Sequence, residues 1–181
     1  MKLLICSDIH GDIEGAENII RFFNDEKCDK ILILGDILYH GPRNNLPQGY
    51  APKAVIKLLN EYKDKIIAVR GNCDAEVDDM VLDFSILADY AILELDGATV
   101  FATHGHHYNT VTPPNLSPGS ILLHGHTHVP KVEEFGNDNL YINPGSVSLP
   151  KEDNPKTLMI YEDSCFTLYD MNKNVIMMTN I

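Results

Sequence analysis

The order of short apolar runs and amphipathic stretches in the first 70 residues restricts the fold more than any other feature of the chain. Three apolar runs, residues 2–6, 30–34 and 65–69, have the length of buried strands. Between them, residues 13–23 and 52–62 carry apolar side chains every three to four positions, the spacing of a helix that buries one face. A βαβαβ order implies parallel strands with right-handed crossovers. The loops that leave these strands therefore share one edge of the sheet.

From residue 90 onward the pattern changes to consecutive strands. Eight runs have strand composition: residues 90–95, 98–103, 121–123, 131–135, 140–143, 157–162, 165–169 and 175–179. Asp96-Gly97 is a two-residue hairpin turn, and no repeat or linker divides the chain. In the first part, Asp12 is expected to cap a helix and Pro52 to begin one. We predict one α/β domain, residues 1–181: a four-layer αββα sandwich of mixed sheets, with a parallel first half and a largely antiparallel second half.

Charge and cysteine content narrow the classes of function. The 14 basic and 26 acidic residues give a net charge of -12, which disfavours partners such as long nucleic acid or an anionic membrane. It does not exclude a small anionic substrate held by metal ions, because bound ions add positive charge. The four cysteines form no C-x-x-C pair, and no signal-peptide core or apolar run of about 18 residues is present. These features predict reduced thiols and a cytoplasmic protein.

Metal-capable side chains follow the apolar runs one after another. The blocks are Asp8-Ile9-His10, Gly35-Asp36, Gly71-Asn72-Cys73-Asp74, His104-Gly105-His106 and His124-Gly125-His126-Thr127-His128. An Asp-x-His triplet arises about once by chance in such a chain, whereas a His-x-His-x-His run is expected only ~0.02 times. Alternate residues of an extended segment share one face, so these imidazoles can converge on one point. The joint order indicates a metal cluster rather than separate turn and capping residues.

These blocks, in this order, resemble the calcineurin-like metallophosphoesterase superfamily, whose motifs are Asp-x-His, Gly-Asp, Gly-Asn-His-Asp/Glu, His and Gly-His-x-His. Asn143-Pro144-Gly145-Ser146 is similar to a further motif of its small single-domain members. Residues 35–44, followed by Pro47, Gly49, Tyr50 and Pro52, resemble the YfcE-type branch of bacterial phosphodiesterases. The resemblance extends over essentially the whole chain.

The resemblance implies a dinuclear metal centre bridged by Asp36. One ion would be held by Asp8, His10, Asp36 and His128, and the second by Asp36, Asn72, His104 and His126. Oxygen and imidazole donors without thiolates suit two divalent ions, with Mn²⁺ expected first and Zn, Fe, Co or Ni as alternatives. Such a pair can hold a hydroxide and aim it at phosphorus. The implied activity is that of a phosphoric diester hydrolase acting on small phosphodiesters.

One departure from the family pattern concerns the general acid. Cys73 stands where most members have His, and a thiol with a pKa of about 8.5 is a poor proton donor to an alkoxide. His106 and His40 are alternatives for that role. Arg43 is expected to clamp a phosphate oxygen, whereas Arg70 is expected to support its loop. The catalytic candidates are Asn72, Cys73, Asp74 and His106, and the substrate-binding candidates are Arg43, His40 and Asn72.

Two other functions stay open at this point. A phosphomonoesterase or nucleotide phosphatase of the same superfamily is the nearest alternative. The other is a non-catalytic scaffold, because the retromer subunit resembles this fold although its site is altered at the Gly-Asp and Gly-Asn positions. Here Gly35-Asp36 and Gly71-Asn72 are both intact, which favours an enzyme. Assembly into a homo-oligomer, dimer or tetramer, is also left open by the sequence.

Overall fold

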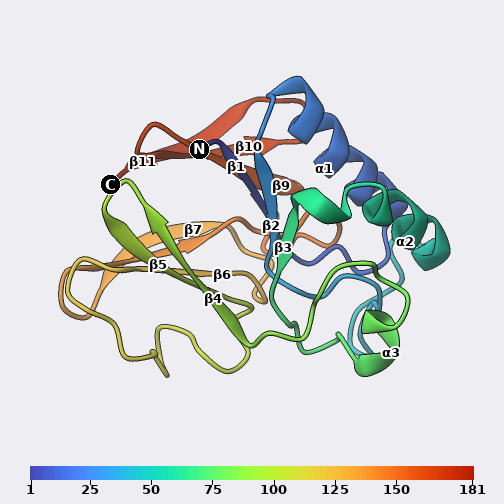
Figure 1. Cartoon of the computed structure of the whole chain (residues 1–181), viewed down its shortest axis with the longest axis horizontal. Coiled ribbons are helices and arrows are strands. Elements are labelled where there is room, and N and C mark those ends of the chain that lie inside the picture. Colours follow the sequence, from blue (N-terminus) through green and yellow to red (C-terminus); the bar gives the residue numbers. More distant parts are fainter.

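A computed structural model describes the whole chain, residues 1–181, as two mixed β-sheets packed face to face (Figure 1). The six-stranded sheet has the order β11-β10-β9-β1-β2-β3, and the five-stranded sheet has the order β4-β5-β6-β8-β7. The helices are α1 (Ile13–Asp25), α2 (Pro52–Asn60) and the single turn α3 (Glu76–Asp79). The strands are β1 (Leu3–Cys6), β2 (Lys30–Ile33), β3 (Ile66–Ala68), β4 (Tyr90–Leu95), β5 (Ala98–Thr103), β6 (Ile121–His124), β7 (Lys131–Phe135), β8 (Asn139–Asn143), β9 (Thr157–Glu162), β10 (Cys165–Asp170) and β11 (Val175–Asn180).

The first half is the predicted parallel unit. β1 pairs in parallel with β2, and β2 pairs in parallel with β3. The side chain of Asp12 accepts a hydrogen bond from the backbone N–H of Glu14 and caps α1, while Pro52 is the first residue of α2. Both helices cover the outer face of the six-stranded sheet (Figure 1). The structure confirms the positions and caps of these two helices, the βαβαβ order along the chain and the parallel pairing of the three strands.

The central strands are buried on both faces, which explains their uninterrupted apolar sequence. In β1, Leu4 packs in the cluster beneath the helices, whereas Leu3 and Ile5 pack between the two sheets. These two clusters contain 22 and 15 buried residues. The six-stranded sheet therefore separates two apolar cores, and both of its faces are packed.

The second half is largely antiparallel, as predicted, with two parallel pairings inside it. β4–β5, β7–β8, β9–β10 and β10–β11 are antiparallel, whereas β6 pairs in parallel with both β5 and β8. Since β9 pairs antiparallel with β1, the end of the chain completes the sheet that the beginning started. The mixed-sheet α/β sandwich is thus confirmed.

The layer outside the five-stranded sheet is an irregular loop rather than a helix. Residues 105–119, which connect β5 to β6, contain Pro113, Pro114 and Pro118, and proline prevents a helix from continuing. Tyr108 of this loop packs against Phe101 on the sheet, with ring centroids 5.4 Å apart. The loop covers only part of the sheet, because Tyr90 and Ile92 on β4 are 48% and 51% exposed. No helix of the structure has the length and apolarity needed to cross a membrane.

Candidate metal centre

The expected ligands stand in loops whose backbone is locally strained. Asp8, His10, Asp36, His126 and His128 all have positive φ angles, between 49° and 66°. This left-handed conformation costs a non-glycine residue roughly 1–3 kcal/mol when the surroundings enforce it, and such residues concentrate at functional sites. These turns end β1, β2 and β6 and reverse the chain direction at the strand ends, where the expected ligands lie.

Glycines let these loops approach one another closely. A Cβ atom placed on Gly71 would lie 2.1 Å from Oδ1 of Asp36, and one placed on Gly125 would lie 1.9 Å from Oγ of Ser7. Both distances are impossible for real atoms, so no other residue fits at either position without moving the backbone. The glycines of the Gly-Asn and Gly-His blocks are thus required by packing around Asp36 and Asp8.

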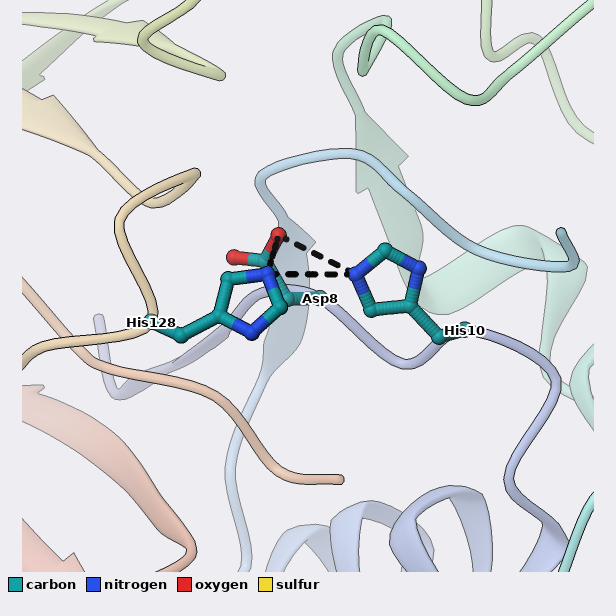
Figure 2. A group of neighbouring side chains, drawn as sticks. All are labelled: Asp8, His10 and His128. Carbon is teal, nitrogen blue, oxygen red and sulfur yellow. Dashed lines mark hydrogen bonds and ion pairs between the residues drawn. The ribbon is translucent and has the colours of Figure 1, made fainter. Parts of the chain in front are cut away.

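Asp8, His10 and His128 form the first cluster (Figure 2). Oδ1 of Asp8 lies 3.6 Å from Nε2 of His10 and 3.2 Å from Nε2 of His128, and the two Nε2 atoms are 3.2 Å apart. The Nδ1 atoms of His10 and His128 face the carbonyl oxygens of Tyr39 and Leu149. Those carbonyls hold protons on Nδ1, so the two Nε2 lone pairs face each other, an arrangement that a cation between them satisfies.

The carboxylate of Asp8 supports the same interpretation. Its Oδ2 accepts hydrogen bonds from Oγ of Ser7 at 2.6 Å and from the backbone N–H of His126 at 3.0 Å. Its Oδ1 is buried and has no hydrogen-bond partner. Although burial alone would raise it, contacts with His10 and His128 hold the pKa of Asp8 well below its usual range. A buried, charged and unpartnered oxygen is expensive unless an ion binds it.

The second cluster is centred on His104. Its Nδ1 faces the carbonyl oxygen of Leu34 at 2.6 Å, and its Nε2 lies 3.1 Å from Oδ1 of Asn72 and 3.1 Å from Nδ1 of His126. Oδ2 of Asp36 is 3.5 Å from the same Nε2. Burial lowers the pKa of His104, but Asp36 and Asp8 more than reverse this and raise it to about 9. Without an ion, a proton therefore compensates the carboxylates here.

Asp36 lies between the two clusters. Its Oδ2 is 3.6 Å from Nε2 of His10 in the first cluster and 3.5 Å from Nε2 of His104 in the second. Its Oδ1 accepts a hydrogen bond from the backbone N–H of Cys73 at 2.8 Å. Burial opposes ionisation, but His104 lowers the pKa of Asp36 below its ordinary value. The side chain therefore lies between the two clusters, within 3.6 Å of an imidazole nitrogen of each.

The donor set fits divalent metal ions. The structure brings all seven residues predicted as ligands into these two adjoining clusters: Asp8, His10, Asp36, Asn72, His104, His126 and His128. They offer carboxylate, amide and imidazole donors, a combination that suits Mn, Fe, Co, Ni and Zn. The orphaned oxygen of Asp8 and the facing imidazole nitrogens are the features that a bound ion would satisfy.

Asp74, one of the catalytic candidates, is bound closely by the backbone. Its carboxylate is buried and accepts hydrogen bonds from the backbone N–H groups of Asp36, Ile37 and Gly71, at 2.8, 2.8 and 2.7 Å. Burial raises the pKa of Asp74 above its ordinary value. Both oxygens accept hydrogen bonds from the backbone, so Asp74, which also lines the cleft, is placed to position the loop that carries Asp36.

A motif near the end of β8 holds the other side of the site. Oγ of Ser146 and Oγ of Ser148 each donate to the backbone carbonyl of Asp8 at 2.9 Å. Nδ2 of Asn143 donates to the carbonyl of Gly125 and to Oγ1 of Thr127, both at 2.9 Å. The Asn143–Ser146 motif therefore fixes the Asp8 turn and the histidine loop. Sequence reasoning noticed the motif but not this function, and it missed Ser7 and Ser148 altogether.

Four of the expected ligands line an open cleft of about 820 Å³: Asp36, Asn72, His126 and His128. Arg43, Arg70, Cys73 and Lys151 also line it. Arg70 pairs with Glu76 at 3.5 Å and donates to the carbonyl of Asp74, the loop-supporting contacts predicted for it. Arg43 and Lys151 form no ion pair with any side chain of the protein. Nothing in the sequence singled out Lys151, which reaches the cleft because its backbone N–H bonds to the carbonyl of His128.

The candidate proton donors lie in three different places. Cys73 lines the cleft, and burial together with Asp36 raises the pKa of its thiol. His106 lies beside the second cluster, 5.4 Å from His104 between ring centroids, and burial with nearby imidazoles lowers its pKa to about 4. His40 does not line the cleft; its ring packs edge-on against Tyr39 and Tyr50. His124, read as structural, is buried against Tyr141.

With this geometry established, comparison with known proteins gives the class. Residues 1–164 match the calcineurin-like phosphoesterase superfamily domain. The chain belongs to this superfamily, as the motif order predicted.

Individual relatives narrow the comparison. Phosphodiesterase YfcE of Escherichia coli K12 is 43% identical over 97% of this chain and 95% of its own. Phosphodiesterase MJ0936 of Methanocaldococcus jannaschii is 31% identical over 80% of this chain and 83% of its own. The solved structure of the E. coli phosphoesterase YfcE superposes with a TM-score of 0.96 over both complete chains, at 41% identity. Vacuolar protein sorting 29 of Cryptosporidium parvum, at 20% identity and a TM-score of 0.62, shares the fold alone.

Proposed function

We propose that this protein hydrolyses small phosphodiesters with the help of two divalent metal ions. The observation that carries the proposal is that two imidazole–carboxylate clusters meet at Asp36 on the floor of a cleft with unpaired cationic side chains. Two relatives that cover most of the chain are named phosphodiesterases, which supports the diester assignment. The scaffold alternative has only distant, fold-level support.

The residues of the site divide the work in three parts. Bound ions supply positive charge that offsets the negative charge of the transition state and makes water a stronger nucleophile. Asp8, His10, Asp36 and His128 would hold one ion, and Asp36, Asn72, His104 and His126 the other. Arg43 at the cleft wall would bind a phosphate oxygen, and its planar guanidinium suits two parallel hydrogen bonds. Asp74 and Ser146 keep the turns that carry the ligands in place.

The chain lacks the histidine that would protonate the leaving group as it departs. Cys73 stands at the position where the superfamily motif has histidine, and its thiol transfers a proton to an alkoxide poorly. We therefore expect faster hydrolysis of esters with acidic leaving groups, such as aryl esters, than of alkyl esters. A series of phosphodiesters with graded leaving-group pKa tests this expectation, and equal rates across the series would contradict it.

A phosphomonoesterase is the nearest competing function. The two activities are separated by comparing hydrolysis of bis-p-nitrophenyl phosphate with that of p-nitrophenyl phosphate at the same Mn²⁺ concentration. We expect the diester to react faster. A strong preference for the monoester would overturn the diesterase assignment while leaving the metal centre intact.

We infer three further properties: the working metal, the compartment and the oligomeric state. Mn²⁺ is proposed as the working ion because the proposed bridge Asp36, Asp8 and Asn72 offer oxygen donors, which suit Mn²⁺. A cytoplasmic location agrees with four free cysteines, since thiols persist in reducing compartments. The exposed apolar residues Val175, Ile176 and Met178 on β11 are compatible with a homo-oligomer. Metal analysis, fractionation and light scattering test these three statements separately.

A further inference from the structure

Cys73 lies among the expected metal ligands and not only beside them. Its Sγ, a ring nitrogen of His10 and a carboxylate oxygen of Asp36 all lie within 4.8 Å of one another. No other cysteine of the chain belongs to such a group. Cys73 is also part of the cleft wall, so an ion that enters the cleft can reach its sulfur.

A second observation points to a cation at the same place. The unpartnered Oδ1 of Asp8, which is fully buried, lies 3.6 Å from Nε2 of His10. Nε2 of His10 is in turn 3.6 Å from Oδ2 of Asp36. His10 therefore faces two carboxylates, and Cys73 completes the group on the side of Asp36. A centre with this much negative charge around one imidazole attracts divalent ions.

The backbone holds the thiol in this position. The N–H of Cys73 donates to Oδ1 of Asp36 at 2.8 Å, which fixes Cα of Cys73 beside the carboxylate. Nδ2 of Asn72 lies 3.2 Å from Sγ and donates toward it, an interaction that favours negative charge on the sulfur. Gly41 leaves space next to the sulfur, because a Cβ there would lie 3.1 Å from Sγ. The hydrogen bonds to Asp36 and Asn72 thus hold the thiol beside the expected ligands.

We propose that Cys73, together with His10 and Asp36, is a thiolate ligand for thiophilic divalent cations such as Co²⁺, Zn²⁺ and Cd²⁺, and that the centre therefore holds these ions differently from Mn²⁺. Metal–sulfur and metal–nitrogen bonds of about 2.3 and 2.1 Å place two ligand atoms of one ion at most about 4.4 Å apart, so a small adjustment closes the group. On binding, the thiol releases its proton to solvent and the sulfur becomes a thiolate. Mn²⁺ favours oxygen donors and leaves the thiol protonated.

This ligand would make the centre selective for the kind of ion. A thiolate bound to the ion would leave it with one coordination position fewer for the substrate. Thiophilic ions should then support turnover less well than Mn²⁺. The inference rests on the metal centre of the proposed function, but it concerns ligand identity and can be measured without any substrate.

Cobalt titration of the full-length, metal-free protein under reducing, oxygen-free conditions tests the proposal. Sulfur-to-cobalt charge-transfer absorption in the near ultraviolet reports a Co²⁺–thiolate bond. We expect this band in the native protein and in the matched control Cys165→Ser, whose thiol is also half-buried but lies on β10. In Cys73→Ser the band should vanish while equilibrium dialysis still detects bound Co²⁺.

The outcomes separate this proposal from the proposed function. Stoichiometric Co²⁺ binding to the native protein without the band, or a band that persists in Cys73→Ser, overturns the thiolate ligand. A protein that shows the band but fails to hydrolyse diesters overturns the proposed function instead. If Cys73→Ser does not fold, thiol alkylation read by mass spectrometry gives the answer: Cd²⁺ should protect Cys73 from the reagent and Mn²⁺ should not, and equal labelling refutes the inference.

Discussion

Asp74→Asn tests whether a buried carboxylate outside the ligand set holds the metal centre in shape. In the native protein, Oδ2 accepts from the N–H groups of Asp36 and Gly71, and Oδ1 accepts from the N–H of Ile37. An asparagine has one carbonyl oxygen, so its amide group must face at least one of these donors. One backbone N–H on the loop of Asp36 is then left without an acceptor in a buried position.

The size of the effect follows from these contacts. An unsatisfied buried donor costs about 1–3 kcal/mol, and the remaining bonds lose the strengthening that a charged acceptor provides. Part of this loss of stability is offset, because the native carboxylate already carries a desolvation cost: burial raises the pKa of Asp74. We expect a net loss of about 2–3 kcal/mol, or roughly 4–12 °C in melting temperature for a chain of this size. Metal affinity should fall about 10–100-fold, as for other residues that orient ligands.

Urea denaturation of the metal-free protein and isothermal titration with Mn²⁺ measure the two effects separately. Glu76→Gln is the matched control, because Glu76 lies in the same segment but makes only an exposed ion pair with Arg70. That control should change stability by less than about 1 kcal/mol. An Asp74→Asn protein as stable as the control, with unchanged Mn²⁺ affinity, would refute the positioning role of Asp74.

Three further predictions concern the site itself. Asp36→Asn should lower diester hydrolysis at least about 100-fold, because it removes the bridging charge, while circular dichroism stays native. Arg43→Gln should raise KM about tenfold with little change in kcat, and Arg43→Lys should not restore it, since lysine lacks the fork of donors. The raised pKa of His104 predicts the pH dependence of the metal-free protein: its stabilisation is complete below about pH 6.5 and is lost as the pH rises toward about 9, so denaturation midpoints should fall across that window.

Local sequence signals predicted the parallel half well, because each of its elements is encoded within a few neighbouring residues. Asp12 caps α1 and Pro52 begins α2, as expected, and apolar runs locate β1, β2 and β3. The parallel pairing of β6 with β5 and β8 was not foreseen, since run composition does not encode which strands become neighbours. Residues 105–119 contain three prolines, which agrees with an irregular loop rather than a helix between β5 and β6.

Residues that position the ligands were harder to predict than the ligands themselves. A ligand is marked by its chemical type and by its place after a strand, as with Asp8 and His128. Ser148 supports Asp8 through a hydrogen bond that spans 140 residues, and only the completed fold shows it. Asp74 was noticed for its carboxylate, but the three N–H groups that occupy that carboxylate come from two separate loops. Contacts of this kind depend on the assembled strand ends.

Holding the ligands in place costs this small protein folding free energy, which its apolar cores offset. Five ligand residues adopt left-handed backbone, Asp8 keeps an unpartnered oxygen, and two imidazole nitrogens face each other, all of which cost folding free energy. The apolar clusters on both faces of the six-stranded sheet supply buried apolar surface that offsets that cost. Ion binding then requires little ordering of the chain, and it adds stability by mass action, about 2.7 kcal/mol at one hundred times the dissociation constant. The net charge of -12 adds long-range attraction for cations, whereas Arg43 and Lys151 at the cleft leave local positive charge for a phosphate.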